Sequence, residues 1–137
     1  MQRNPAEEGR RWFLQAEHDL DDARYLFEGR RFHLACFLAQ QAAEKALKAF
    51  LYSLGADFVW GHSLAELSKD AQEIDPDFAS IAQDASSLDK YYIPTRYPNG
   101  LPGGIPAQAY TEADAHLALS TAQKVIDFVR ERLKLRE

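Results

Sequence analysis

The sequence predicts an all-α fold: a five-helix antiparallel up-and-down bundle with one long Pro/Gly-rich loop before the last helix. Apolar residues recur at three- and four-residue steps in five segments, the spacing of one helix face, and no segment has the pattern of a β-strand. The connections between the segments are short except one, as in helical bundles. With 137 residues, 46% of them hydrophobic, the chain is expected to form a single domain over residues 1–137.

The first two helices are long and follow each other closely. We expect the first at residues 6–28, and Gly29 marks the turn after it. The second is expected at residues 32–54, where Gly55 stops it. This second segment is apolar around nearly its whole circumference, which indicates burial on several sides. We therefore expect it at the centre of the bundle, with apolar surface to spare for a second subunit.

The other three helices are recognised by the residues at their starts. Short polar side chains at these positions accept hydrogen bonds from the first free backbone N–H groups of a helix. The signals are the capping box Ser63–Glu66 for the third helix, Asp75 before Pro76 for the fourth, and Thr111 with Asp114 for the fifth.

Composition excludes several classes of protein. The net charge of −5 weighs against a dedicated DNA or RNA binder, because such proteins need a basic face. The single cysteine, Cys36, rules out an internal disulfide. We find no secretory signal and no run of about 18 apolar residues, so we expect a cytoplasmic protein without a membrane span. No metal-ligand spacing or phosphate-binding glycine loop is present, and we expect neither a metal nor a cofactor.

The loop at residues 90–110 holds four prolines and three glycines, with Arg96 near its start. Prolines restrict the backbone, so we expect an ordered loop that presents the arginine. Its planar group of donors would suit a phosphate or a carboxylate. Alternatively, Arg96 caps the last carbonyls of the preceding helix or pairs with Asp89. The residues alone place the structural alternative slightly ahead.

A polar row interrupts the apolar second helix at Gln41, Glu44, Lys45 and Lys48. The two lysines could attract a phosphate into a groove. Alternatively, the row is the solvated edge of a buried helix, with Glu44–Lys48 as a weak i,i+4 ion pair, and we favour this alternative.

Two further side chains are candidates for chemistry. His62 precedes the third helix, where it would either pack on Leu67 as a staple or act as a base or phosphate ligand. Cys36 is rejected as a nucleophile, because a free cysteine in an alanine-rich helix is usually buried and inert.

Four stretches resemble a known family. They are "AEHDLDDARYLFEGRRFHLACFLAQQAAEKALKAFL", "GHSLAEL", "YYIPTRYP" and "YTEADAHLALSTAQKVIDFVRERL", and together they resemble a HEPN domain over about residues 9–134. The resemblance implies an antiparallel helical bundle, usually a homodimer. The sequence is also similar to the C-terminal module of sacsin, which is linked to nucleotide binding. Prokaryotic HEPN proteins often act with a minimal nucleotidyltransferase, in some cases as toxin and antitoxin.

Many HEPN proteins are metal-independent ribonucleases, with an arginine followed by four to six residues and a histidine. This signature is missing after Arg96, where the sequence continues "YPNGLPGGIP". Arg11 and His18 have the spacing, but they only share a face of the first helix, so we regard the match as accidental. His62 could replace the missing histidine only if the fold brings it near Arg96. The sequence therefore weighs against an enzyme.

The resemblance makes a nucleotide-binding HEPN module, dimeric and paired with a nucleotidyltransferase, our preferred interpretation. A ribonuclease toxin and a purely structural dimerisation module remain open as alternatives, and RNA binding is weakly supported. The ligand would be a nucleotide of the ATP or GTP type, with phosphate on the arginine and a base stacked on a tyrosine. The candidate binding residues are Arg96, Tyr97, Tyr92, His62, Lys45 and Lys48.

Overall fold

A computed structural model describes residues 4–135, and the predicted all-α fold is confirmed. The described residues form six α-helices and three short 3-10 turns, with no strand. The helices are α1 (Pro5–Glu28), α2 (Phe32–Ser53), α3 (Leu64–Ile74), α4 (Ala79–Ser87), α5 (Pro106–Ala109) and α6 (Glu112–Leu135). The turns are η1 (Pro76–Phe78), η2 (Leu88–Tyr91) and η3 (Pro98–Gly100).

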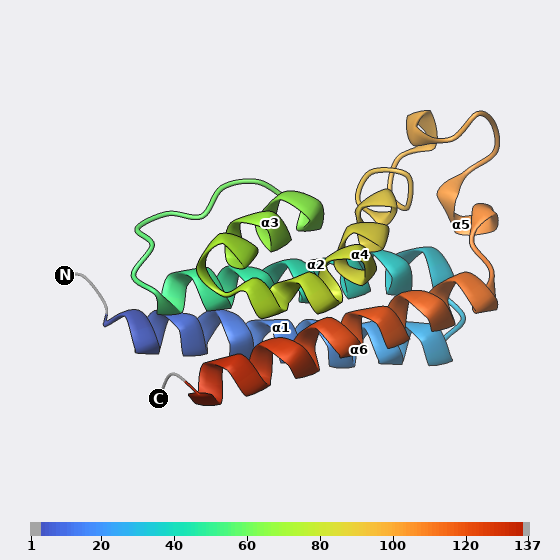
Figure 1. The fold of residues 1–137 in the computed structure, drawn as a ribbon. Coiled ribbons are helices and arrows are strands. Elements are labelled where there is room, and N and C mark those ends of the chain that lie inside the picture. The colour runs from blue at the N-terminus through green and yellow to red at the C-terminus, as the bar shows by residue number, and fades with distance from the viewer. Residues whose placement is uncertain (1–3, 136–137) are drawn as a thin grey trace.

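The three long helices lie side by side, and the α3–α4 hairpin packs over α2 and α6 (Figure 1). Helix α1 runs opposite to both α2 and α6 (Figure 1). For α6, two ion pairs fix this direction: Arg30, just after α1, pairs with Glu112 at the start of α6, and Glu17, in the middle of α1, pairs with Arg130 near the end of α6. No helix in the described part of the chain is long and apolar enough to cross a membrane.

The central position predicted for α2 is confirmed. Its small residues Ala35, Ala39, Ala42 and Ala46 are fully buried, and they let α1, α3 and α6 approach closely. Most of the apolar circumference of α2 is thus covered within one chain. Four apolar residues in the first half of α2 are only partly buried, so apolar surface for a second subunit stays a prediction; they are Phe32, Leu34, Phe37 and Leu38.

The predicted helix starts are confirmed at the level of hydrogen bonds. Ser63 Oγ accepts from the backbone N–H of Glu66 at 3.2 Å, and Thr111 and Asp114 bond each other's backbone N–H groups at 3.1 and 2.9 Å. Asp75 opens the 3-10 turn η1 by accepting from the N–H of Asp77.

The predicted fourth helix is divided into η1, α4 and η2. Near the end of α4, the hydroxyls of Ser86 and Ser87 donate to carbonyls three residues earlier, at 2.9 and 2.6 Å. Such bonds compete with regular helix geometry, and the chain tightens into η2 there. The long loop that follows is also partly helical, because it contains η3 and α5.

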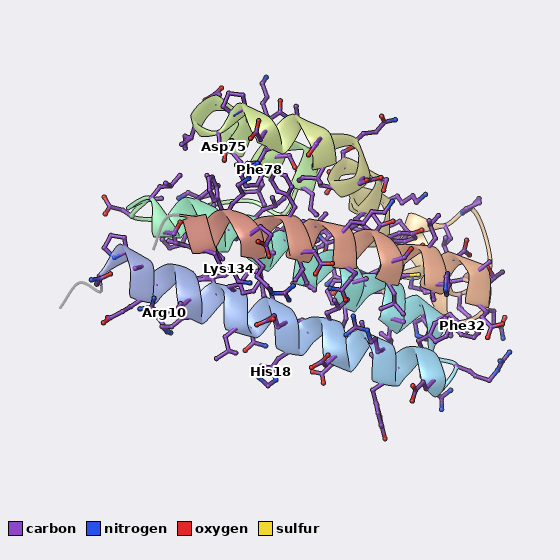
Figure 2. All side chains as sticks on the ribbon, turned by 60° about the horizontal axis from the view of Figure 1, so that its bottom comes forward. Arg10, His18, Phe32, Asp75, Phe78 and Lys134 are labelled. Carbon is purple, nitrogen blue, oxygen red and sulfur yellow. The ribbon has the colours of Figure 1, made fainter. Side chains whose placement is uncertain are left out.

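Aromatic side chains fill the space between the long helices and the α3–α4 hairpin. Phe78, at the α3–α4 junction seen in Figure 2, lies 4.4 Å from Phe50 and 4.9 Å from Phe128, ring centre to ring centre. Arg132 of α6 pairs with Asp75 and with Asp77 at the same junction. This end of the hairpin is therefore fixed to α6, and its other end carries the candidate site.

Segment 54–63, here called the strap, connects α2 to α3 and returns along α2 (Figure 1, green). Gly55 and Gly61 have φ angles of 95° and 91°, which favour glycine at both of its bends. The backbone N–H of Val59 donates to Tyr52 Oη at 3.1 Å, and Gln40 Nε2 donates to the carbonyl of His62 at 3.2 Å. These bonds hold the strap against α2.

Candidate functional site

Arg96 lies at the start of the long loop, against three aromatic rings. Its Cζ atom is 4.3 Å from the ring centre of Phe37, 4.6 Å from that of Tyr92 and 5.2 Å from that of Tyr97. Its Nε donates to the carbonyl of Tyr92 at 2.8 Å, so it bonds the backbone one residue past η2 and not the last carbonyls of α4. The terminal nitrogens have no acceptor among residues 4–135. We call these four residues the arginine cluster.

The loop around Arg96 is held in place by its neighbours. Thr95 is fully buried, and its hydroxyl donates to the carbonyl of Tyr91 at 2.5 Å. Gly100 packs so closely on Pro94 that a Cβ there would lie 2.9 Å from the Cα of the proline. The backbone that carries Arg96 is therefore constrained, as its prolines indicated.

His62 joins this cluster from the end of the strap. Its ring stacks on Tyr92, with ring centres 4.6 Å apart and planes inclined by 20°. Its Nδ1 lies 3.2 and 3.3 Å from the two carboxylate oxygens of Glu44, while the side chain stays 54% exposed. His62 and Arg96 thus contact the same tyrosine, although they are far apart in sequence.

Asp89 explains why His62 meets Tyr92. Its carboxylate accepts from the backbone N–H groups of Leu64 and Ala65, at 2.6 and 3.1 Å, and from Ser63 Oγ at 3.1 Å. A negative charge is favourable at this helix N-terminus. Asp89 therefore ties η2 to the start of α3 instead of pairing with Arg96, and the residue before the cap lies beside Tyr92.

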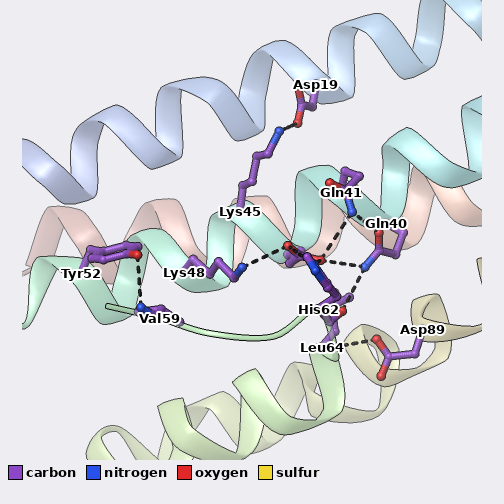
Figure 3. Close-up of polar contacts among 11 residues, drawn as sticks. Asp19, Gln40, Gln41, Lys45, Lys48, Tyr52, Val59, His62, Leu64 and Asp89 are labelled. Atoms are coloured by element: carbon purple, nitrogen blue, oxygen red, sulfur yellow. Dashed lines mark hydrogen bonds and ion pairs between the residues drawn. The ribbon is translucent and has the colours of Figure 1, made fainter. Parts of the chain in front are cut away.

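A buried polar row lies beneath the strap, where Gln40, Glu44 and Lys48 are 0%, 3% and 6% exposed. Glu44 accepts from Gln40 Nε2 and Gln41 Nε2 at 3.2 and 3.4 Å, and from Lys48 Nζ at 3.2 Å (Figure 3). We expected this row to be a solvated edge of α2. That expectation is wrong for the ion pair Glu44–Lys48, which is buried beneath the strap.

Lys45 does not belong to the cluster. Its Nζ lies 2.6 Å from Oδ2 of Asp19 on α1, and Figure 3 shows it directed away from His62. Neighbouring helix positions differ by about 100°, so Glu44 faces His62 of the strap while Lys45 faces α1. Lys48 reaches the cluster only through Glu44.

The structure thus unites four predicted residues, Arg96, Tyr92, Tyr97 and His62. It adds Phe37 and Glu44, which the sequence did not assign to the site. The available signal was their spacing, because Phe37 and Glu44 are seven residues apart on one face of α2.

Other candidates lie elsewhere. Cys36 is fully buried, and burial raises the pKa of its thiol to about 12, which agrees with its rejection as a nucleophile. His18 projects from the outer side of α1 (Figure 2), where it and Arg11 line an open hollow of about 790 Å³. Arg11 is paired with Glu8 at 2.8 Å. Arg11 and His18, which have the ribonuclease spacing in the sequence, therefore lie apart from the arginine cluster.

The HEPN domain model matches residues 10–132, nearly the whole chain. The chain belongs to the HEPN domain family. A solved neighbour, TT1696 from Thermus thermophilus, has 43% identity and a TM-score of 0.83, and the match covers 90% of this chain and 97% of that one. ST0689, an archaeal HEPN homologue, has 38% identity and a TM-score of 0.76, with 97% and 99% covered.

Two more relatives extend the comparison. A HEPN domain protein from Thermotoga maritima, tm0613, has 30% identity and a TM-score of 0.72, with 90% of this chain and 98% of that one covered. A protein of Methanocaldococcus jannaschii named "Putative toxin MJ1304" is 27% identical over 129 residues, 88% of this chain and 84% of its own. The resemblance stated from the sequence is confirmed.

This HEPN chain departs from the ribonuclease pattern in a specific way. His116, the next histidine after Arg96, lies on α6 with its ring 6.3 Å from that of Phe27, at the far end of α1. The histidine that shares a tyrosine with Arg96 is instead His62, from the other side of the sequence.

Proposed function

We propose that this HEPN chain binds a nucleotide at the arginine cluster, as a homodimer that acts with a nucleotidyltransferase in a toxin–antitoxin pair. The observation that carries the binding proposal is the stacking of Arg96 on three aromatic rings, with its terminal nitrogens directed to no acceptor in the described chain. A guanidinium held in this way loses little further conformational entropy on binding and can contact a phosphate with two donors.

The surroundings favour a small ligand. Tyr97 is 51% exposed, so its ring is accessible for stacking by a base, a contact that tolerates any nucleobase. The net charge of −5 opposes a long polyanion much more than a mononucleotide. The toxin–antitoxin part of the proposal is supported by the family and by the name of the Methanocaldococcus relative.

Thermal unfolding in the presence of ATP, GTP and other mononucleotides tests the proposal. A ligand at a hundred times its dissociation constant should stabilise the native state by about 2.7 kcal/mol. We expect this shift to disappear in Arg96→Ala and to shrink in Arg96→Lys, which keeps the charge but loses the planar group of donors. Lys45→Ala is the matched control, because it removes a cation outside the cluster. An unchanged shift in Arg96→Ala would refute the assignment.

A second candidate, metal-independent RNA cleavage, is favoured by one observation: Glu44 and Tyr92 orient His62 beside the arginine cluster. With the proton on Nδ1 directed at Glu44, Nε2 could take the proton of a 2′-hydroxyl. The 2′-oxygen would attack the adjacent phosphorus, the bond to the 5′-oxygen would break, and that oxygen would take a proton. Arg96 would stabilise the charge on the phosphate oxygens.

The products distinguish this candidate from binding alone. Cleavage would leave a 2′,3′-cyclic phosphate, which mass spectrometry detects, and it would persist in EDTA. We expect His62→Gln to abolish cleavage and His18→Gln, on the outer side of α1, to leave it unchanged. Intact RNA after incubation with the wild-type protein would exclude this candidate and leave the binding proposal standing.

A further inference from the structure

A second hollow, of about 570 Å³, lies between the start of α1 and the start of the strap. It is lined by three aromatic rings, those of Trp12, Tyr52 and Phe58, and by the carboxylates Glu8 and Asp57. Its volume falls within the range of small-molecule sites, about 300–1,000 Å³. None of the contacts described for the arginine cluster involves it.

Two of its rings are held rigidly. Trp12 and Tyr52 stack with ring centres 5.0 Å apart and an angle of 23° between their planes. The indole N–H of Trp12 donates to Oε1 of Glu8 at 3.1 Å, and Tyr52 Oη accepts from the backbone N–H of Val59. Polar atoms of both rings are therefore engaged, and each ring covers one face of the other. Tyr52 is only 7% exposed, so a ligand in the hollow would meet mainly Trp12 and Phe58 and only the edge of Tyr52.

The third ring stands at the open side. Phe58 is 61% exposed and lies 4.1 Å from Trp60, which is 79% exposed, ring centre to ring centre. The strap thus holds two large aromatic side chains in solvent, at a cost that contact with a ligand would offset. Only Phe58 of this pair lines the hollow.

The charge of the hollow is negative. No lysine, arginine or histidine lines it in the described chain, and Asp57 has no ion-pair partner among residues 4–135. Glu8 is already paired with Arg11. Trp12 also has Lys48 Nζ 5.8 Å from its ring centre, and that ammonium is neutralised by Glu44. The Trp12 ring therefore already accepts one cation from within the protein.

We propose that this hollow binds a small organic ammonium ion, with the cation against the rings of Trp12 and Phe58 and near the carboxylate of Asp57. Aromatic faces attract cations through their quadrupole, and quaternary ammonium groups are bound by sets of such rings. A bare metal ion would need converging acidic, histidine or cysteine ligands, and residues 4–135 hold no group of three. An uncharged apolar ligand would gain nothing from the carboxylates.

Tryptophan fluorescence provides the test. The chain has two tryptophans, so Trp60→Phe leaves Trp12 as the single reporter and keeps a ring beside Phe58. In this background we expect choline and tetramethylammonium to produce a saturable change in Trp12 emission. The neutral isostere of choline, 3,3-dimethylbutan-1-ol, should bind about 2- to 30-fold more weakly, the range that a cation–π contact supports.

Matched variants locate the site. Phe58→Ala and Asp57→Asn change exposed positions of the strap and should each weaken choline binding several-fold. Tyr25→Ala and Asp70→Asn remove an exposed ring and an exposed carboxylate elsewhere and should have no effect. The proposal is overturned by no saturable response, by equal binding of the neutral isostere, or by unchanged binding in both strap variants. Arg96→Ala should bind choline normally, which separates this test from the nucleotide proposal.

Discussion

Replacing Glu44 by glutamine tests the buried ion pair beneath the strap. The change keeps the size of the side chain but leaves Lys48, only 6% exposed, without a counter-charge. Removing one partner of a buried pair typically costs about 3–5 kcal/mol, because the other charge stays in a poorly solvated place. For a chain of this size, that corresponds to a decrease in Tm of about 10–20 °C.

A second substitution separates the charge from the packing. In Glu44→Gln/Lys48→Met neither charge remains, and replacement of a buried pair by an apolar side chain is often neutral. We therefore expect the double variant to recover most of the lost stability. The control is Glu131→Gln, which breaks the exposed pair with Lys134 at 3.5 Å and should change the free energy of unfolding by less than about 1 kcal/mol.

Urea unfolding followed by circular dichroism measures these differences. The account is refuted if Glu44→Gln costs no more than Glu131→Gln, or if the double variant is no more stable than Glu44→Gln alone. The first result would mean that water reaches Lys48 under the strap, and the second that the unpaired charge is not the cause of the lost stability.

Three further predictions concern other parts of the fold. Gly9→Ala should cost about 1–3 kcal/mol, since a Cβ there would lie 2.8 Å from Ser53, whereas Gly103→Ala, with open space around it, should be nearly neutral in the same urea measurement. Asp89→Asn should cost about 1–2 kcal/mol, because the carboxylate cap of α3 loses its charge. Burial raises the pKa of Cys36 from its ordinary 9.0 to about 12, so the native thiol stays protonated where the unfolded thiol ionises. Its contribution to stability is complete below pH 9 and decreases up to about pH 12. Accordingly, Cys36→Ala should lose less stability than the wild type between these values, and a parallel loss in both would contradict the shift.

Helix starts could be predicted from the sequence because they depend on local hydrogen bonds. Ser63, Asp75 and Thr111 each cap the element that the neighbouring residues indicated. The central position of α2 could also be predicted, because a helix that is apolar around its circumference must be buried by neighbouring elements. Which elements cover it could not be predicted from the local pattern. The other helices of the same chain cover most of it, and Leu34 and Leu38 stay partly exposed, so a second subunit on this helix stays a prediction.

The candidate site was predictable only in part. Arg96 and Tyr97 could be identified together because they share one short loop. The approach of His62 to Tyr92 depends on Asp89 reaching the start of α3 across the fold, a contact between residues about 25 positions apart. The burial of Glu44 and Lys48 depends on the path of the strap, which no local pattern encodes.

Nucleotide binding at the arginine cluster is tested most directly by NMR of the four histidine rings during titration with ATP and GTP. Each histidine reports on a different place: His62 on the cluster, His18 on the outer side of α1, His116 on the ring of Phe27 and His33 on the start of α2. We expect the His62 signal to move saturably in the wild type and to stay fixed in Arg96→Ala. A stationary His62 signal, or a saturable shift at His18 instead, would contradict the account.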